Sequence, residues 1–129
     1  MKLAIADFLE DRLSEEALLA KAAAGESPEW VYSSEETIDG ENVYFTVTAK
    51  NGTAWEPDYF LSIIEDHRDA DRADHIARWS PARVLADVEA KRAMVRELVF
   101  DGAGPREWLL RQLAAPYASH PKYRQEWKP

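Results

Sequence analysis

Residues 73–98 read ADHIARWSPARVLADVEAKRAMVREL, and this stretch specifies more of the fold than any other part of the chain. Ser80 followed by Pro81 is typical of a helix start, because serine can accept hydrogen bonds from the free N–H groups of the first turn and proline has no N–H to lose there. The sequence therefore predicts a helix that begins at Pro81. A helical segment at 69–78 is expected before it, so that two helices meet at Trp79-Ser80.

The helix after Pro81 carries an apolar stripe and a charged face. The apolar residues recur at steps close to 3.6 residues, as in a helix with one buried side: Val84, Leu85, Val88, Met94, Val95, Leu98 and Val99. The opposite face is charged, with Arg83, Asp87, Glu89, Lys91, Arg92 and Arg96. Asp87 stands four residues before Lys91, a spacing that favours an ion pair worth roughly 0.2–0.5 kcal/mol.

Residues 2–24 also predict an amphipathic helix, which Gly25 ends. One stripe of this segment is apolar: Ile5, Phe8, Leu9, Leu13, Ala17 and Ala20. Leu18 and Leu19 lie outside that stripe. They leave two interpretations open, a homodimer formed through this helix or a broad buried face.

Beyond Gly25 the pattern changes to the two-residue period of β-strands. The sequence predicts strands at 30–32 and 42–50, and it favours a short third strand at 59–64 over a helix. In the second strand Val43, Phe45, Val47 and Ala49 share one side.

Asp39-Gly40 and Asn51-Gly52 predict the two hairpin turns between these strands. A two-residue loop at Asn51-Gly52 places Trp55 on the polar face of the sheet. Either a bulge shifts the register after Ala54, or Trp55 covers the outer face.

The C-terminal third begins with a flexible break at 101–104, after which Pro105 opens a short helix containing Trp108, Leu109, Leu110 and Leu113. Pro116 closes that helix. The tail, YASHPKYRQEWKP, is too rich in aromatic residues for a typical disordered end, so Tyr117, Tyr123 and Trp127 are expected to pack on the rest of the molecule.

Length and composition narrow the classes of protein that remain. A chain of 129 residues fits a single domain, residues 1–129, with one core. The formal net charge of −8 disfavours broad binding to nucleic-acid phosphates. There is no cysteine, which excludes disulfides, thiolate zinc sites and cysteine nucleophiles. Acidic residues interrupt the apolar N-terminus and no stretch has the length of a membrane span, so we expect a cytoplasmic protein without a membrane partner.

These patterns predict an α+β fold. The N-terminal helix and a group of C-terminal helices would pack on one face of a small antiparallel β-meander of three to four strands.

Two segments resemble a known family. The phrase HIAR-W-S-PARVLADVEAKR at 75–92 and the tail YASHPKYRQEWKP at 117–129 are similar to small uncharacterised proteins of actinobacteria and their phages, which are classed as a domain of unknown function. That family often has Arg-His-Asp-Pro where this chain has Arg78-Trp79-Ser80-Pro81, and Asp in place of Ser119. The resemblance implies the same order of structural elements and a phage or prophage origin, and it implies no activity.

Metal and carboxylate chemistry have few candidates in this sequence. His67, Asp71 and His75 stand at steps of four, so on one continuous helix they would share a face, as ligands of one divalent ion do. The alternative is a charged helix face in solvent. Glu89 paired with Glu107 or Glu126 is the conceivable pair of catalytic carboxylates, and nothing in the sequence fixes it. No nucleophile elbow, phosphate loop or dinucleotide motif occurs, and no cofactor is expected.

The helix-break-helix at 69–98 raises a DNA-binding interpretation, in which Arg83, Lys91 and Arg92 would enter a major groove. Its alternative is a core helix with a mixed-charge outer face. Trp79 is either a hydrophobic staple or an exposed anchor for a partner. His120, Tyr123, Arg124 and Trp127 form either a packed tail or the edge of a binding surface.

The function that these observations favour is a non-enzymatic, acidic interaction protein of phage or prophage origin, which modulates a host or viral protein. A small metal-dependent hydrolase using His67, Asp71 and His75 is one alternative, and a helix-turn-helix-like regulator that binds DNA is another.

Overall fold

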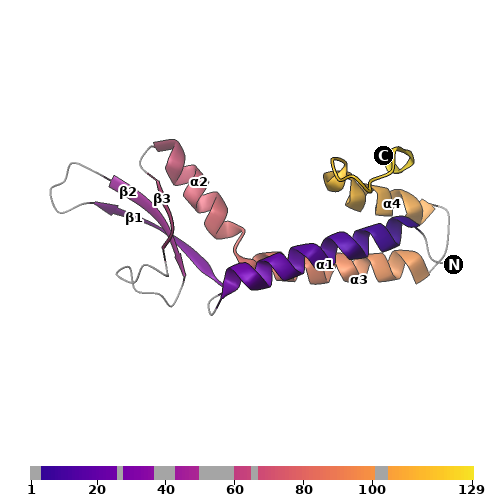
Figure 1. Cartoon of the computed structure of the whole chain (residues 1–129), viewed down its shortest axis with the longest axis horizontal. Coiled ribbons are helices and arrows are strands. Elements are labelled where there is room, and N and C mark those ends of the chain that lie inside the picture. The colour runs from indigo at the N-terminus through magenta and orange to yellow at the C-terminus, as the bar shows by residue number, and fades with distance from the viewer. Residues whose placement is uncertain (1–3, 26–27, 37–42, 50–59, 65–66, 101–104) are drawn as a thin grey trace. The chain divides into compact units, whose positions relative to one another are not determined.

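The structure is a computed structural model that describes residues 4–25, 28–36, 43–49, 60–64, 67–100 and 105–129. These residues contain four α-helices and three β-strands (Figure 1). In chain order they are α1 (Ala4–Ala24), β1 (Trp30–Glu36), β2 (Val43–Ala49), β3 (Phe60–Ile64), α2 (His67–Arg78), α3 (Pro81–Phe100) and α4 (Pro105–Ala114). Two short 3-10 helices follow, η2 (Ala115–Tyr117) and η3 (Gln125–Trp127).

The chain divides into two compact units. The helical unit comprises Met1–Leu18 and Ala86–Pro129, and the sheet unit comprises Leu19–Leu85. Helices α1 and α3 therefore each contribute residues to both units. Folding as a single domain stays a prediction.

The core of the helical unit forms where α1, α3, α4 and the C-terminal tail meet. The predicted α1 stripe is confirmed, since all six of its members are buried. Three of them, Ile5, Phe8 and Leu9, lie in the core of the helical unit together with Val95, Leu110, Ala114, Tyr123 and Trp127. The buried aliphatic positions hold this unit together, because each fully buried Leu, Ile or Val side chain contributes roughly 1.5–3 kcal/mol relative to an exposed one.

The helix boundaries agree with the local signals in the sequence. Helix α3 begins at Pro81, as predicted, and the N–H of Val84 donates to the carbonyl oxygen of Ser80 at 3.0 Å. The short helix predicted from Pro105 is α4. Gly25 follows α1 with a φ of 53°, a left-handed conformation that glycine adopts without steric cost.

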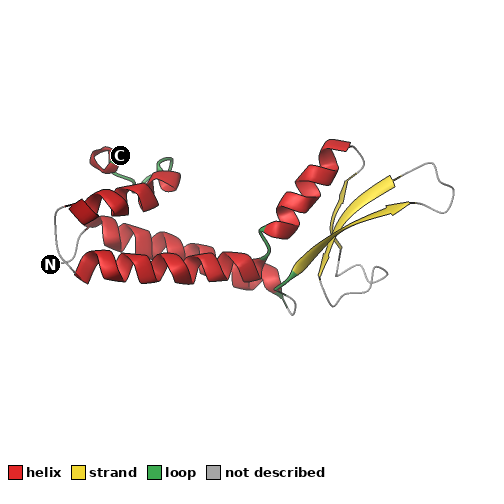
Figure 2. Cartoon of the chain, turned by 180° about the vertical axis from the view of Figure 1, so that it is seen from behind, coloured by secondary structure: helices red, strands yellow, loops and turns green. Residues whose placement is uncertain are grey.

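The sheet unit contains an antiparallel sheet with strand order β1-β2-β3. Strand β1 pairs with β2 from Trp30 opposite Ala49 to Glu36 opposite Val43, and the β2–β3 register shifts after Val47. Helix α2 contacts all three strands (Figure 2). Its buried residues Ala73 and Ala77 pack with Val47, one of the four side chains predicted to share the inner side of that strand.

The predicted fold class is wrong. The described part of the chain is mostly helical, and its helices do not form a layer on one face of a meander. Instead, α1, α3 and α4 share a core of their own with the tail, and α2 is the helix that covers the sheet. The periodicity of each helix was informative about a buried face, but not about which element covers that face, because a helix and a sheet bury the same apolar stripe equally well. The two hairpin turns and the position of Trp55 lie outside the described residues.

Candidate functional site

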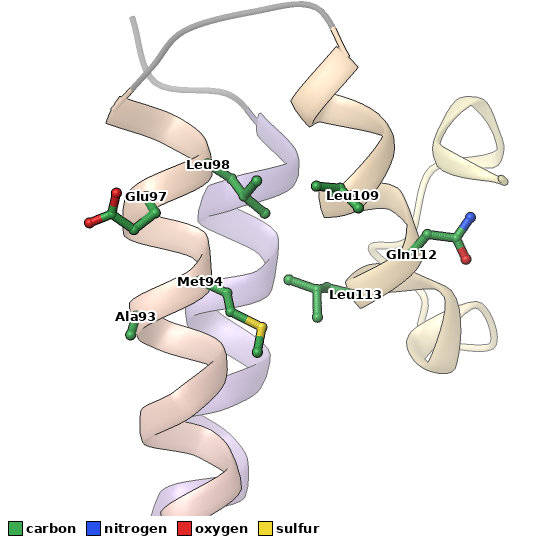
Figure 3. Close-up of a pocket in the computed structure, with 7 residues that line it drawn as sticks. All are labelled: Ala93, Met94, Glu97, Leu98, Leu109, Gln112 and Leu113. Carbon is green, nitrogen blue, oxygen red and sulfur yellow. The ribbon is translucent and has the colours of Figure 1, made fainter.

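An apolar groove lies between α3 and α4 in the helical unit. Its volume is about 480 Å³, and it is lined by Ala93, Met94, Glu97, Leu98, Leu109, Gln112 and Leu113. Met94 and Leu109 are 52% and 42% exposed, although both are large apolar side chains. Figure 3 shows Met94 and Leu98 of α3 directed toward Leu109 and Leu113 of α4. We call these seven residues the α3–α4 groove.

The two polar residues of the α3–α4 groove lie at its edges. The carboxylate of Glu97 extends from the outer edge of α3, and the amide of Gln112 points away from α3 (Figure 3). Among the described residues, Glu97 has neither a hydrogen-bond nor an ion-pair partner. The centre of the groove is therefore apolar, and the Glu97 carboxylate on its rim is unpaired within the described part of the chain.

A polar cluster in the helical unit surrounds the Arg12 side chain. The Arg12 side chain is 5% exposed, and its Nε and Nη2 donate to the two carboxylate oxygens of Glu15 at 3.0 and 2.7 Å. Its Nη1 lies 3.0 Å from Nδ1 of His120. A guanidinium can only donate, so this Nδ1 must be the acceptor and carries no proton. The backbone N–H of Lys122 donates to the same nitrogen at 3.1 Å, which fixes the His120 ring in the tail.

The aromatic residues of the tail converge on Phe8 of α1. The Phe8 ring lies 5.1 Å from Trp127, 6.0 Å from Tyr123 and 6.3 Å from Tyr117, measured between ring centroids. Tyr123 and Trp127 are buried, as expected for a tail that packs on the rest of the molecule. Both residues belong to the core, with only 9% of Tyr123 and 5% of Trp127 exposed.

The other tail residues proposed for binding, His120 and Arg124, differ in accessibility. His120 is half-buried between Phe8 and Arg12. Arg124 is exposed, and its guanidinium lies 5.3 Å from the centroid of the Trp127 ring and 3.6 Å from the Glu126 carboxylate. The Arg124 guanidinium thus lies over the buried indole ring.

Tyr117 links the tail to α1 by a short hydrogen bond. Its hydroxyl donates to Oε1 of Glu16 at 2.6 Å. Burial, followed by this hydrogen bond, raises the pKa of Tyr117 well above its ordinary value. The phenol therefore remains a donor to Glu16 throughout the neutral pH range.

Trp79 and Arg83 lie together in the sheet unit. The Arg83 guanidinium stands 4.4 Å from the centroid of the Trp79 ring, within the range of a cation–π contact. The His75 ring lies 6.2 Å from the Trp79 ring, measured between ring centroids. Trp79 remains 45% exposed, so part of its ring is accessible to a partner.

Lys91 and Arg92 have carboxylate partners inside the helical unit. The predicted pair is confirmed, since Nζ of Lys91 lies 2.7 Å from Oδ2 of Asp87. Arg92 donates to Glu89 and to the hydroxyl of Ser14, both at 3.1 Å. Lys91 therefore pairs within α3, whereas Arg92 contacts both α3 and α1; DNA binding through these residues stays a prediction.

The metal candidates His67, Asp71 and His75 all lie on α2, which begins at His67. Asp71 and His75 are exposed, and the side chain of His67 lies outside what the structure describes. Among the described side chains, no group of three or more His, Asp or Glu residues is arranged to hold an ion. Nor is any helix in the described part of the chain long and apolar enough to cross a membrane.

The sequence analysis did not single out the α3–α4 groove. Its signal was present in α4, where Trp108, Leu109 and Leu110 are consecutive. Successive helical residues point about 100° apart, so three adjacent apolar side chains cannot all face one core. Leu110 is fully buried, whereas Trp108 is 57% exposed.

Fold and groove together define a small, mainly helical protein whose described residues leave an apolar groove exposed. The sequence model of the Family of unknown function (DUF6221) matches residues 3–129, so the chain belongs to that family. The predicted membership of a domain-of-unknown-function family is thereby confirmed. No curated protein and no solved structure matches the chain.

Proposed function

We propose that this protein is a non-enzymatic interaction protein of phage or prophage origin, which modulates a host or viral protein in the cytoplasm by binding it through the α3–α4 groove. The observation that carries the proposal is the exposure of Met94 and Leu109 in a groove of about 480 Å³. Contiguous exposed apolar surface is unfavourable in water and commonly marks a site that another molecule covers. The origin rests on the similarity of the 75–92 and 117–129 segments to proteins of actinobacteria and their phages.

The proposal also agrees with the chemistry of the groove. Its centre is lined by aliphatic side chains and the thioether of Met94, and its two polar groups lie on the rim. Interface cores are depleted in charge and enriched in Met and aromatic residues, and methionine adapts readily to the shape of a partner.

Affinity capture with matched variants tests this proposal. Tagged wild type, Leu109→Glu and Leu18→Glu are each incubated with actinobacterial lysate, and the retained proteins are quantified by mass spectrometry. Leu18 is the control because it is 69% exposed and lies outside the groove. We expect one protein to be retained by wild type and L18E and lost from L109E. Equal retention by all three, or no retained protein, would contradict the proposal.

A further inference from the structure

The shape of the α3–α4 groove indicates the kind of element that fills it. Met94 and Leu98 are four residues apart on α3, and Leu109 and Leu113 are four residues apart on α4, so each helix presents two apolar side chains one turn apart. A helix laid between two such rows places its own apolar residues, at i, i+3 or i+4 and i+7, between them. The 10 residues of α4 span about 15 Å, which accommodates roughly three turns of a third helix.

The rim of the groove indicates the charge of that helix. Glu97 stands on the α3 side without a partner among the described residues. On the α4 side, Trp108 precedes the rim residue Gln112 by four positions and is 57% exposed, so its indole adjoins that edge. A carboxylate and an aromatic face both attract a cation. The chain as a whole is also acidic, with a formal net charge of −8.

A second copy of the chain does not meet this requirement. The lining that it would bring offers only Glu97 and Gln112 as polar residues, and neither of them is a cation. Two acidic chains would also repel each other. The occupant that satisfies both the apolar centre and the rim is therefore a different molecule.

We infer that the α3–α4 groove binds a cationic amphipathic helix of a partner protein, with its apolar stripe on Met94, Leu98, Leu109 and Leu113 and a Lys or Arg side chain at Glu97. This inference rests on the proposed function and names the partner element that the same site recognises.

Two synthetic peptides test the inference. Both have leucines at i, i+3, i+4 and i+7 over three turns; one carries lysines on the flanks and the other carries glutamates at the same positions. Their binding to the full chain is measured by fluorescence anisotropy of a labelled peptide. The lysine peptide should bind wild type and L18E alike, and at least about tenfold more tightly than the glutamate peptide binds.

Two groove variants make the test specific. Leu109→Glu should weaken the lysine peptide about tenfold or more, because it places a charge in the apolar centre. Glu97→Lys should weaken the lysine peptide severalfold and strengthen the glutamate peptide. The inference would be overturned if wild type bound the two peptides equally, or if neither L109E nor E97K changed the affinity for them. Circular dichroism of both variants verifies that the fold is retained, as expected at exposed positions.

Other occupants give different results. A concentration-dependent dimer in sedimentation velocity that L109E abolishes would assign the groove to a second copy. An apolar dye that binds wild type but not L109E, with no binding of either peptide, would assign it to a small apolar molecule. If lysate capture finds a partner that L109E loses but the peptides are not discriminated, the proposed function stands and the cationic helix is refuted. If the lysine peptide binds as expected but capture retains nothing, the proposed function fails alone.

Discussion

Arg12 and Glu15 form an ion pair whose partners differ sharply in burial, and this difference predicts the order of two mutational effects. The side chain of Arg12 is 5% exposed, whereas that of Glu15 is 62% exposed. Glu15→Ala leaves a buried guanidinium with His120 as its remaining hydrogen-bond partner among the described side chains. Arg12→Met leaves a carboxylate that water can solvate and places an apolar side chain beside Phe8. We therefore predict that E15A destabilises the protein more than R12M, although Arg12 is the buried residue.

The magnitude follows from the two hydrogen bonds that E15A removes, at 3.0 and 2.7 Å. Hydrogen bonds to charged groups contribute roughly 1.5–3 kcal/mol when buried, and exposed ion pairs contribute at most about 1 kcal/mol. With one partner buried and the other exposed, E15A should lower the free energy of unfolding by about 2 kcal/mol. R12M should cost less than about 1 kcal/mol, because an apolar side chain of similar volume often replaces a buried charge at little cost.

Urea unfolding followed by circular dichroism measures these differences. With a slope of roughly 1–3 kcal/mol per molar urea, E15A should lower the midpoint by about 1 M. The double variant R12M/E15A should be more stable than E15A, with a coupling energy of at least about 1 kcal/mol. Glu126→Ala is the control, since Glu126 and Arg124 form an exposed pair at 3.6 Å, and it should change stability by less than about 0.5 kcal/mol. An R12M variant at least as destabilised as E15A, or zero coupling, would refute the reasoning.

Three further predictions concern the tail and the end of α1. The pKa of Tyr117 is raised in the folded state, so the stabilisation that its neutral phenol provides is complete below the ordinary tyrosine pKa near 10 and is lost as the pH rises further. Wild type should therefore lose more stability than Tyr117→Phe between pH 8 and 10.5 in urea titrations. Equal losses would contradict this prediction. In the same assay, Trp127→Ala should lower the free energy of unfolding by about 3–5 kcal/mol, whereas Arg124→Ala should lower it by less than about 1 kcal/mol. Similar losses for the two variants would show that the tail is not part of the core. Gly25→Ala should lower the free energy of unfolding by about 1 kcal/mol. The cause would be backbone strain alone, since no atom stands within 4 Å of the added methyl group. A neutral result would argue against the left-handed φ at this position.

The local structure could be predicted well where one residue type has a strong conformational preference. Pro81 and Pro105 begin α3 and α4, and Gly25 follows α1, because proline and glycine restrict or release the backbone whatever the surroundings. The strand predicted at 59–64 was favoured over a helix, and the pairing of β3 with β2 confirms it. Such signals act within a few residues and need no knowledge of the tertiary fold.

Long-range partners could not be predicted in the same way. Phe8 and Trp127 are more than one hundred residues apart and both pack in one core, but each is only an apolar side chain in the sequence. The burial of Arg12 was missed for a related reason. Glu15 stands three residues after Arg12, but nothing near Arg12 in sequence reveals its contact with His120, and a charged residue is ordinarily expected at the surface.

The α3–α4 groove arises because core packing fixes the rotation of each helix, whereas the local sequence places apolar residues next to the buried ones. Leu110 and Ala114 anchor α4 in the core, and this anchoring fixes the rotation of the helix about its axis. Leu109 precedes Leu110 by one position, so the same rotation must turn it about 100° away from the core centre. Met94 stands one position before the buried Val95 on α3 and is turned outward for the same reason. Because the two outward residues meet on the same side, the packing of the core itself produces an apolar surface, and only a further element can cover it.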